Sequence, residues 1–184
     1  LMEPEEVAAA FDYLEQAGKV RHFGVSNQNP MMMELLKTAV QQPLKINQLQ
    51  LSAAFTPSFE AGFHVNMEGP KAAVRDGSVF EYCRLTDTVI QAWSVLQHGY
   101  FKGNFVGKEE FAALNHVLND LAKKYQVTPT AIALAWVLRY PGKMQAVIGT
   151  TKPQHVLEAG KAAEVNLTRK EWYQIYLAAG NDLP

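Results

Sequence analysis

The sequence predicts an α/β fold in a single domain, with a parallel sheet covered by helices. Two observations lead to this prediction. Short apolar, β-branched runs alternate with amphipathic helical patterns, and capping residues, Gly or Pro separate them. A leading helix is followed by about four β-then-α units and a terminal helix, an order typical of parallel sheets. The chain has 184 residues, 48% of them hydrophobic, which is enough for one core over residues 1–184.

Helix starts are the clearest local signals. Pro4 and the glutamates after it favour a first helix over residues 4–17, which Gly18 ends. Asn29-Pro30 and Thr128-Pro129 are cap and first-turn pairs for two later helices. Two capping boxes are expected, one from Thr151 to Gln154 and one from Thr168 to Glu171. Strands are expected at 20–25, 46–51, 88–93 and 146–148, and the other helices at 30–40, 80–85, 109–125, 128–139, 151–163 and from 168 onward.

Composition narrows the classes of partner. The net charge of −1 gives no general attraction to nucleic acid or to anionic membranes. No apolar run approaches the ~18 residues that a membrane span needs. The single cysteine, Cys83, rules out an internal disulfide framework, and the acidic start is not typical of a signal peptide. We therefore expect a cytoplasmic protein without nucleic-acid or membrane partners. No His or Cys spacing indicates a metal site.

Polar and aromatic residues gather where the expected strands end. In parallel α/β folds ligands lie at the carboxyl ends of strands. Each set has a structural explanation as turn, strand or cap chemistry, but together they offer groups for a carboxamide, a flat ring and a phosphate. These features describe a nicotinamide dinucleotide phosphate. The sets are Ser26-Asn27, Gln48, Trp93-Ser94 and Gly149-Thr150-Thr151-Lys152.

Five longer segments carry a family resemblance: "GKVRHFGVSN" (18–27), "INQLQLS" (46–52), "VIQAWSVLQHG" (89–99), "AWVLRYPGKMQAVIGTT" (135–151) and "LTRKEWYQIYLAAGNDLP" (167–184). They resemble the aldo-keto reductases, which are NADPH-dependent (β/α)8 barrels of the TIM type. The resemblance runs over essentially the whole chain, which looks most similar to a bacterial subgroup of the family. It implies that this chain corresponds to the carboxyl-terminal half of such a barrel, with four of its β/α units.

The resemblance also implies a role for each candidate residue in binding NADP(H). Ser26, Asn27 and Gln48 would hold the nicotinamide carboxamide, and Trp93 would stack on the ring. The loop that covers the pyrophosphate would contain Ser94, Leu96 and Gly99. The 2′-phosphate end would be held by Thr150, Thr151, Lys152 and His155. Two positions depart from the family pattern: Val95 replaces a proline, and His155 stands where many members have arginine.

The family's catalytic Asp, Tyr, Lys and His have no matching motif in this sequence, and we expect them upstream of the helix at which this chain starts. No catalytic residue is therefore assigned. The main hypothesis is the cofactor-binding half of an oxidoreductase that reduces a small aldehyde or ketone.

Two alternatives stay open. The chain could be an inactive half-barrel that binds nucleotide, or a scaffold that self-associates or pairs with a missing half. It could also be an unrelated barrel enzyme that binds a sugar phosphate. Within the reductase hypothesis, the loop over residues 55–80, with its phenylalanines and Met67, is a candidate substrate-specificity segment.

Overall fold

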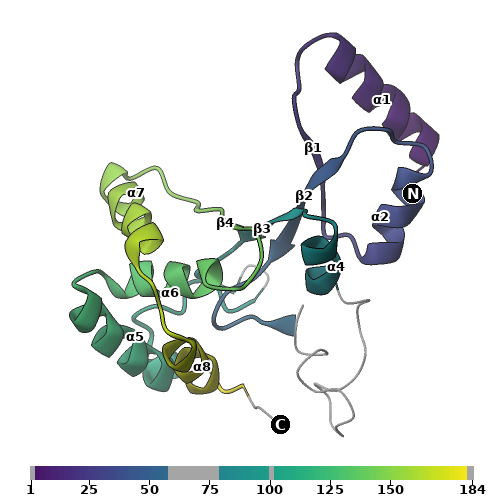
Figure 1. Cartoon of the computed structure of the whole chain (residues 1–184). Helices are drawn as coiled ribbons and strands as arrows, with labels where there is room; N and C mark the ends of the chain where they lie inside the picture. The colour runs from purple at the N-terminus through teal and green to yellow at the C-terminus, as the bar shows by residue number, and fades with distance from the viewer. Residues whose placement is uncertain (1–2, 58–78, 100–101, 182–184) are drawn as a thin grey trace, which may run out of the picture.

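A four-stranded parallel sheet forms the centre of the molecule (Figure 1). The computed structural model describes residues 3–57, 79–99 and 102–181, so most of the candidate specificity loop lies outside the described residues. The strands follow one another in chain order, and each neighbouring pair is parallel. The predicted α/β class with four parallel units is confirmed. The strands are β1 (Phe23–Ser26), β2 (Leu44–Gln50), β3 (Val89–Trp93) and β4 (Met144–Ala146).

Helices connect the strands and flank the sheet. The first two lie beside β1, and the helix directly before β3 lies on the same side as the second of them, whereas the helices after β3 gather on the other side of the molecule, beyond β4 (Figure 1). None of the helices in the described residues is long and apolar enough to cross a membrane. The helices are α1 (Pro4–Gln16), α2 (Pro30–Lys37), α4 (Val79–Leu85), α5 (Ala112–Tyr125), α6 (Pro129–Leu138), α7 (Pro153–Gly160) and α8 (Arg169–Ala178), with 3-10 turns at Glu109–Phe111 and Lys161–Glu164.

Three of the predicted helix caps are confirmed. The Asn29 side chain accepts a hydrogen bond from the Met32 N–H at 2.9 Å, and the Thr128 hydroxyl accepts one from the Ala131 N–H at 3.2 Å. The capping box at the start of α8 has both of its reciprocal bonds. These caps could be predicted because their donors and acceptors lie within three residues of each other.

The capping box predicted at Thr151 is wrong. Helix α7 begins at Pro153, and its N-cap position is Lys152, whose side chain makes no capping bond. The hydroxyl of Thr150 accepts the N–H of Lys152 at 3.2 Å, so the local turn forms one residue earlier. Gln154 instead donates from its side chain to Glu158 within the helix at 3.2 Å.

All four strands differ from their predicted ranges by one to three residues at one or both ends, because pairing, rather than apolar content, sets where a strand begins. Strand β1 starts at Phe23, the first residue that pairs with β2, and it runs through Ser26. Strand β4 pairs with residues 90–92 of β3 and so ends at Ala146, although the Val147 N–H still donates to the Ala92 carbonyl at 2.8 Å.

Gly24 allows β1 and β2 to approach each other closely. A Cβ atom at this position would lie 2.6 Å from the Cβ of Ile46 and 2.7 Å from its carbonyl oxygen. Any side chain here would therefore force the two strands apart, which makes glycine a requirement of the close approach rather than of a turn.

The main core lies between the sheet and helices α5, α6 and α8. Every residue from Ala131 to Val137 in α6 is buried, as its apolar sequence predicts. Trp136 and Trp172 join α6 to α8: their rings stack at 4.8 Å, and each indole N–H donates to the other residue's carbonyl at 3.0 Å. Buried indoles with both N–H groups satisfied hold these helices in a defined position.

Glu171 links the start of α8 to α5. Its carboxylate accepts hydrogen bonds from Lys124, from Tyr125 at 2.8 Å and from both the N–H and the hydroxyl of Thr168. Burial raises the pKa of this carboxyl, but the bonds from Lys124, Thr168 and Tyr125 outweigh burial and lower the pKa from 4.5 to about 2.

We expect Glu171→Gln to destabilise the fold by roughly 1–2 kcal/mol at pH 7, after allowance for solvent screening. Glutamine can keep its oxygen where Tyr125 and Thr168 donate, but its NH₂ cannot accept from Lys124, so the change removes the charge together with the Lys124 bond. Because the folded-state pKa is depressed, the contribution is complete above the ordinary pKa of 4.5 and disappears as the pH falls toward 2. Urea unfolding at pH 7 and pH 3 measures it, with Glu109→Gln as the exposed control. An equal loss at both pH values would contradict this assignment.

Candidate cofactor-binding site

Ser26, Asn27 and Gln48 form a hydrogen-bonded cluster on β1 and β2. The Ser26 hydroxyl donates to the Gln48 carbonyl at 3.2 Å, and the Asn27 backbone N–H donates to the same oxygen at 2.9 Å. The Asn27 side-chain amide donates to the Ser26 hydroxyl at 2.9 Å. Gln48 lies within β2 rather than just beyond its end, but its register partner is Ser26, so the three residues meet as predicted.

Asn27 and Ser94 share an unusual backbone conformation. Each has a φ of 53°, in the left-handed region, and each directly follows the last residue of a strand. Non-glycine residues rarely adopt this conformation, and asparagine does so most readily. The two residues turn the chain at the ends of β1 and β3, which β2 separates, and both lie at the same edge of the sheet as Trp93.

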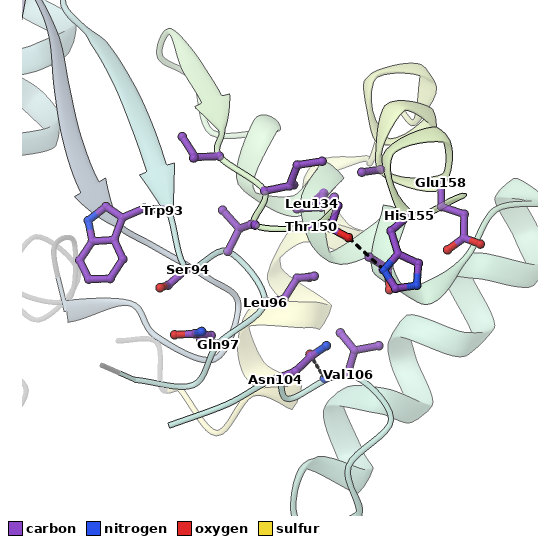
Figure 2. A pocket seen from close by; sticks show the side chains of 16 residues that line it. Trp93, Ser94, Leu96, Gln97, Asn104, Val106, Leu134, Thr150, His155 and Glu158 are labelled. Atoms are coloured by element: carbon purple, nitrogen blue, oxygen red, sulfur yellow. Dashed lines mark hydrogen bonds between the residues drawn. The ribbon is translucent and has the colours of Figure 1, made fainter. Parts of the chain in front are cut away.

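A cavity of about 670 Å³ lies at this edge (Figure 2). Trp93 stands at one end of it, and Thr150, His155 and Glu158 stand at the other. Between them the walls are largely apolar, with Leu96 on one side. This volume is in the range of sites for small organic molecules. An aromatic ring at one end and hydroxyl, imidazole and carboxylate groups at the other suit an elongated ligand with a flat ring and a polar tail.

The polar end of the cavity is built where β4 leads into α7. The Thr150 hydroxyl lies 3.3 Å from the Nδ1 atom of His155. Thr151 and Lys152 are exposed on the same turn, so Lys152 carries a mobile cation beside this end. Apart from Gly149 itself and its two chain neighbours, no atom of the described residues lies within 4 Å of a Cβ built at Gly149, which leaves open space beside its backbone.

Nine of the twelve predicted residues fall into two neighbouring groups. Six of them line the cavity, and the cluster of Ser26, Asn27 and Gln48 adjoins it through β2, because Gln50 on the Gln48 face pairs with Trp93. Gly99 is buried in the loop after β3, where its carbonyl accepts the Lys102 N–H at 3.2 Å. The six lining residues are Trp93, Ser94, Leu96, Gly149, Thr150 and His155.

Sequence reasoning missed four polar residues of the cavity: Gln97, Asn104, Thr130 and Glu158. Gln97 and Asn104 pair across the loop after β3 in an isolated antiparallel bridge, a contact that a strand-end search does not include. Glu158 lies in the second turn of α7, beyond the cap on which the prediction concentrated. Its helical spacing from His155 could have indicated it, since residues three apart share a helix face.

Comparison with protein families matches residues 2–178 to the Aldo/keto reductase family. The chain belongs to the aldo-keto reductase family. The match covers nearly all of the sequence and both parts of the site just described, so the family predicted from the sequence is confirmed.

Two characterised sequences illustrate the relationship. The chain is 32% identical over 185 residues to 6-dehydroglucose reductase of Agrobacterium fabrum, with 100% of this chain and 55% of that protein aligned. It is also 32% identical over 186 residues to oxidoreductase YdhF of Escherichia coli, with 100% of this chain and 56% of that protein aligned. The chain therefore spans about half the length of these two relatives.

Solved structures of aldo-keto reductases share the fold. An enzyme of Klebsiella pneumoniae, determined in complex with NADPH, superposes with a TM-score of 0.71 at 21% identity, covering 95% of this chain and 54% of that one. The aldose reductase of Giardia lamblia gives 0.68 at 18% identity, covering 96% and 50%. The predicted TIM-type barrel fold is confirmed, and the four β/α units described here correspond to about half of those chains.

The left-handed backbone conformation of Asn27 limits which residues this position tolerates. We expect Asn27→Val to lower stability by about 1–2 kcal/mol more than Asn27→Gly, because both lose the side-chain bond to Ser26 but only valine is strained at positive φ. Thermal melting of the two variants measures the difference. Equal melting temperatures would show that the backbone at residue 27 relaxes without cost.

Proposed function

We propose that this chain forms the nucleotide-binding part of an oxidoreductase that transfers hydride from NADPH to an aldehyde or ketone. The observation that carries the proposal is the cavity between Trp93 and the Thr150–His155 pair, with the cluster of Ser26, Asn27 and Gln48 beside its aromatic end. Family membership supports it. So does the neighbour solved with NADPH, which has this fold.

The aromatic end suits the nicotinamide. Ser26, Asn27 and Gln48 supply hydroxyl and amide groups that can both donate to and accept from a carboxamide. The Trp93 indole offers a face on which a flat ring can stack. The two contacts together would decide which face of the ring points away from the protein and toward a substrate.

The polar end suits the phosphate groups. Thr150 and Thr151 offer hydroxyls and Lys152 a cation in the turn that leads into α7, and His155 offers an imidazole in the first turn of that helix. The first backbone N–H groups of a helix favour an anion. The open space beside Gly149 lets a phosphate approach the backbone there. His155 in place of an arginine weakens the preference for a 2′-phosphate, so use of NADH is part of the proposal.

The middle of the cavity also fits a polar ligand. The side-chain oxygen of Gln97 is buried, and no group in the described part of the chain donates to it. A buried acceptor left unpaired costs about 1–3 kcal/mol, and a bound molecule with a donor removes that cost. Ser94, Leu96 and Gly99 belong to the same loop and would cover the pyrophosphate.

The reaction divides between this chain and the remainder of such an enzyme. When bound, the reduced nicotinamide supplies the hydride. The residues of this chain bind and orient the nucleotide, and we assign none of them as the proton donor. The family's catalytic Asp, Tyr, Lys and His are proposed to lie in the part of the relatives that this chain does not span.

Replacing Trp93 tests the site. We expect NADPH to quench tryptophan fluorescence of the 184-residue chain, and Trp93→Ala to remove most of the quenching and to weaken binding about tenfold through loss of stacking. Calorimetry measures the affinity independently of the fluorophore. Tyr13→Ala, an exposed aromatic change on α1, is the control and should bind normally. No response of the unaltered chain to millimolar NADPH would contradict the proposed function.

A scaffold role is the second candidate, because the sheet has open edges. Strands β1 and β4 each pair with a single strand in the described residues. Parallel sheets are normally covered on both faces, whereas Ser26 and Gln145 on one face are exposed. Another half-barrel, or a second copy of this chain, would cover these groups.

We therefore expect the isolated chain to self-associate. Light scattering after size exclusion should give a mass above the 20.5 kDa of one chain, and the mass should rise with concentration. A monodisperse 20.5 kDa species with a cooperative melting transition would refute the prediction.

A further inference from the structure

Polar residues occupy one row across the entire sheet. Ser26 is the register partner of Gln48, Gln48 of Gln91, and Gln91 of Gln145. These four residues, named here the polar row, share one face of the sheet because register partners project to the same side. Only Ser26 and Gln48 belong to the proposed nicotinamide cluster, so Gln91 and Gln145 have no role in the function described above.

The three glutamines of the polar row form a directed chain of hydrogen bonds. The Nε2 of Gln48 donates to the Oε1 of Gln91 at 3.2 Å, and the Nε2 of Gln91 donates to the Oε1 of Gln145 at 2.9 Å. Each amide thus holds the next in one of its two possible orientations. Gln91 is half-buried between its two partners, whereas Gln145 is exposed on β4.

The orientation of Gln48 decides what it can offer a bound carboxamide. A primary amide has one acceptor oxygen and an NH₂ group with two hydrogens. With its Nε2 committed to Gln91, Gln48 has its Oε1 as the acceptor for the NH₂ of a carboxamide. In the opposite orientation the NH₂ of Gln48 would face the NH₂ of the carboxamide, and neither could accept a hydrogen bond. A Gln48 side chain free to rotate would lose entropy when the ligand binds.

We propose that Gln91 is a positioning residue for the nicotinamide site, and that Gln145 supports it. Gln91 fixes the amide of Gln48 so that its oxygen accepts from the carboxamide NH₂. This inference rests on the proposed function, because it assumes that Gln48 binds the carboxamide. It adds a residue of β3, and an exposed one of β4, that neither touch the nucleotide nor line the cavity.

The hypothesis that the polar row has only a structural role predicts a different result. The polar row would stabilise the sheet face without regard to the chemistry of the ligand. Loss of Gln91 would then lower the melting temperature and weaken the binding of all nucleotides by the same factor. A positioning role affects only ligands that present an NH₂ group to Gln48, which gives a readout that stability alone does not change.

The test uses two ligands that differ in this one group: NADPH and its reduced 3-acetylpyridine analogue, whose methyl ketone lacks the NH₂. Calorimetry of the 184-residue chain gives the affinity for each. Gln91→Met keeps the side-chain length but removes both hydrogen bonds. Gln91→Glu keeps the acceptor for Gln48. Gln41→Met, an exposed change before β2, is the matched control, and melting curves accompany each variant.

We expect Gln91→Met to weaken NADPH binding about five- to tenfold, in line with one hydrogen bond, and to leave the analogue within about twofold. Gln91→Glu should retain the preference for NADPH over the analogue, and Gln41→Met should match the unaltered chain. Equal losses for both ligands in Gln91→Met, or none, would overturn the positioning role while the proposed function stands. Failure of the unaltered chain to bind NADPH would overturn both.

Discussion

Parallel pairing of the four strands is the constraint on which the rest of the molecule depends. Because all four run in the same direction, their carboxyl ends lie at one edge, along which Ser26, Trp93 and Thr150 are arranged although they are far apart in the sequence. The same pairing fixes which side chains share a row. The ends of the strands therefore place the residues that line the cavity, and the register of the strands aligns the amides of the polar row.

Packing among helices α5, α6 and α8 supports the wall of the cavity at this edge. The reciprocal tryptophan pair joins α6 to α8, and Glu171 joins α8 to α5 through Lys124 and Tyr125. Helix α6 in turn contributes Thr130 and Leu134 to the wall of the cavity. A contact far from the ligand thus contributes to the shape of its site, because a buried helix cannot shift without moving residues on its opposite side.

Features that depend on a few consecutive residues were predictable, and features that depend on register were not. The caps at Asn29, Thr128 and Thr168 follow from groups within three residues, and the strand-end residues follow from the general rule for parallel sheets. The cap at Thr151 failed because Thr150 offers a competing hydroxyl one residue earlier. The link from Gln48 through Gln91 to Gln145 could not be predicted, since it requires the alignment of three strands that the sequence does not state.

The close approach of β1 and β2 at Gly24 links the packing of the sheet to the candidate site, because it requires a residue without a side chain. Gly24 lies two residues before Ser26 on the same strand, so a substituent there acts as a wedge whose displacement reaches the Ser26–Gln48 contact. Gly24 does not line the cavity, yet the proposed function implies that its tolerance to substitution would follow cofactor affinity as closely as stability. In a saturation library sorted for nucleotide binding, substitutions at position 24 would be depleted like those at a contact residue. Only a second sort of the same library for folding would distinguish a residue that sets the distance between strands from one that binds the nucleotide.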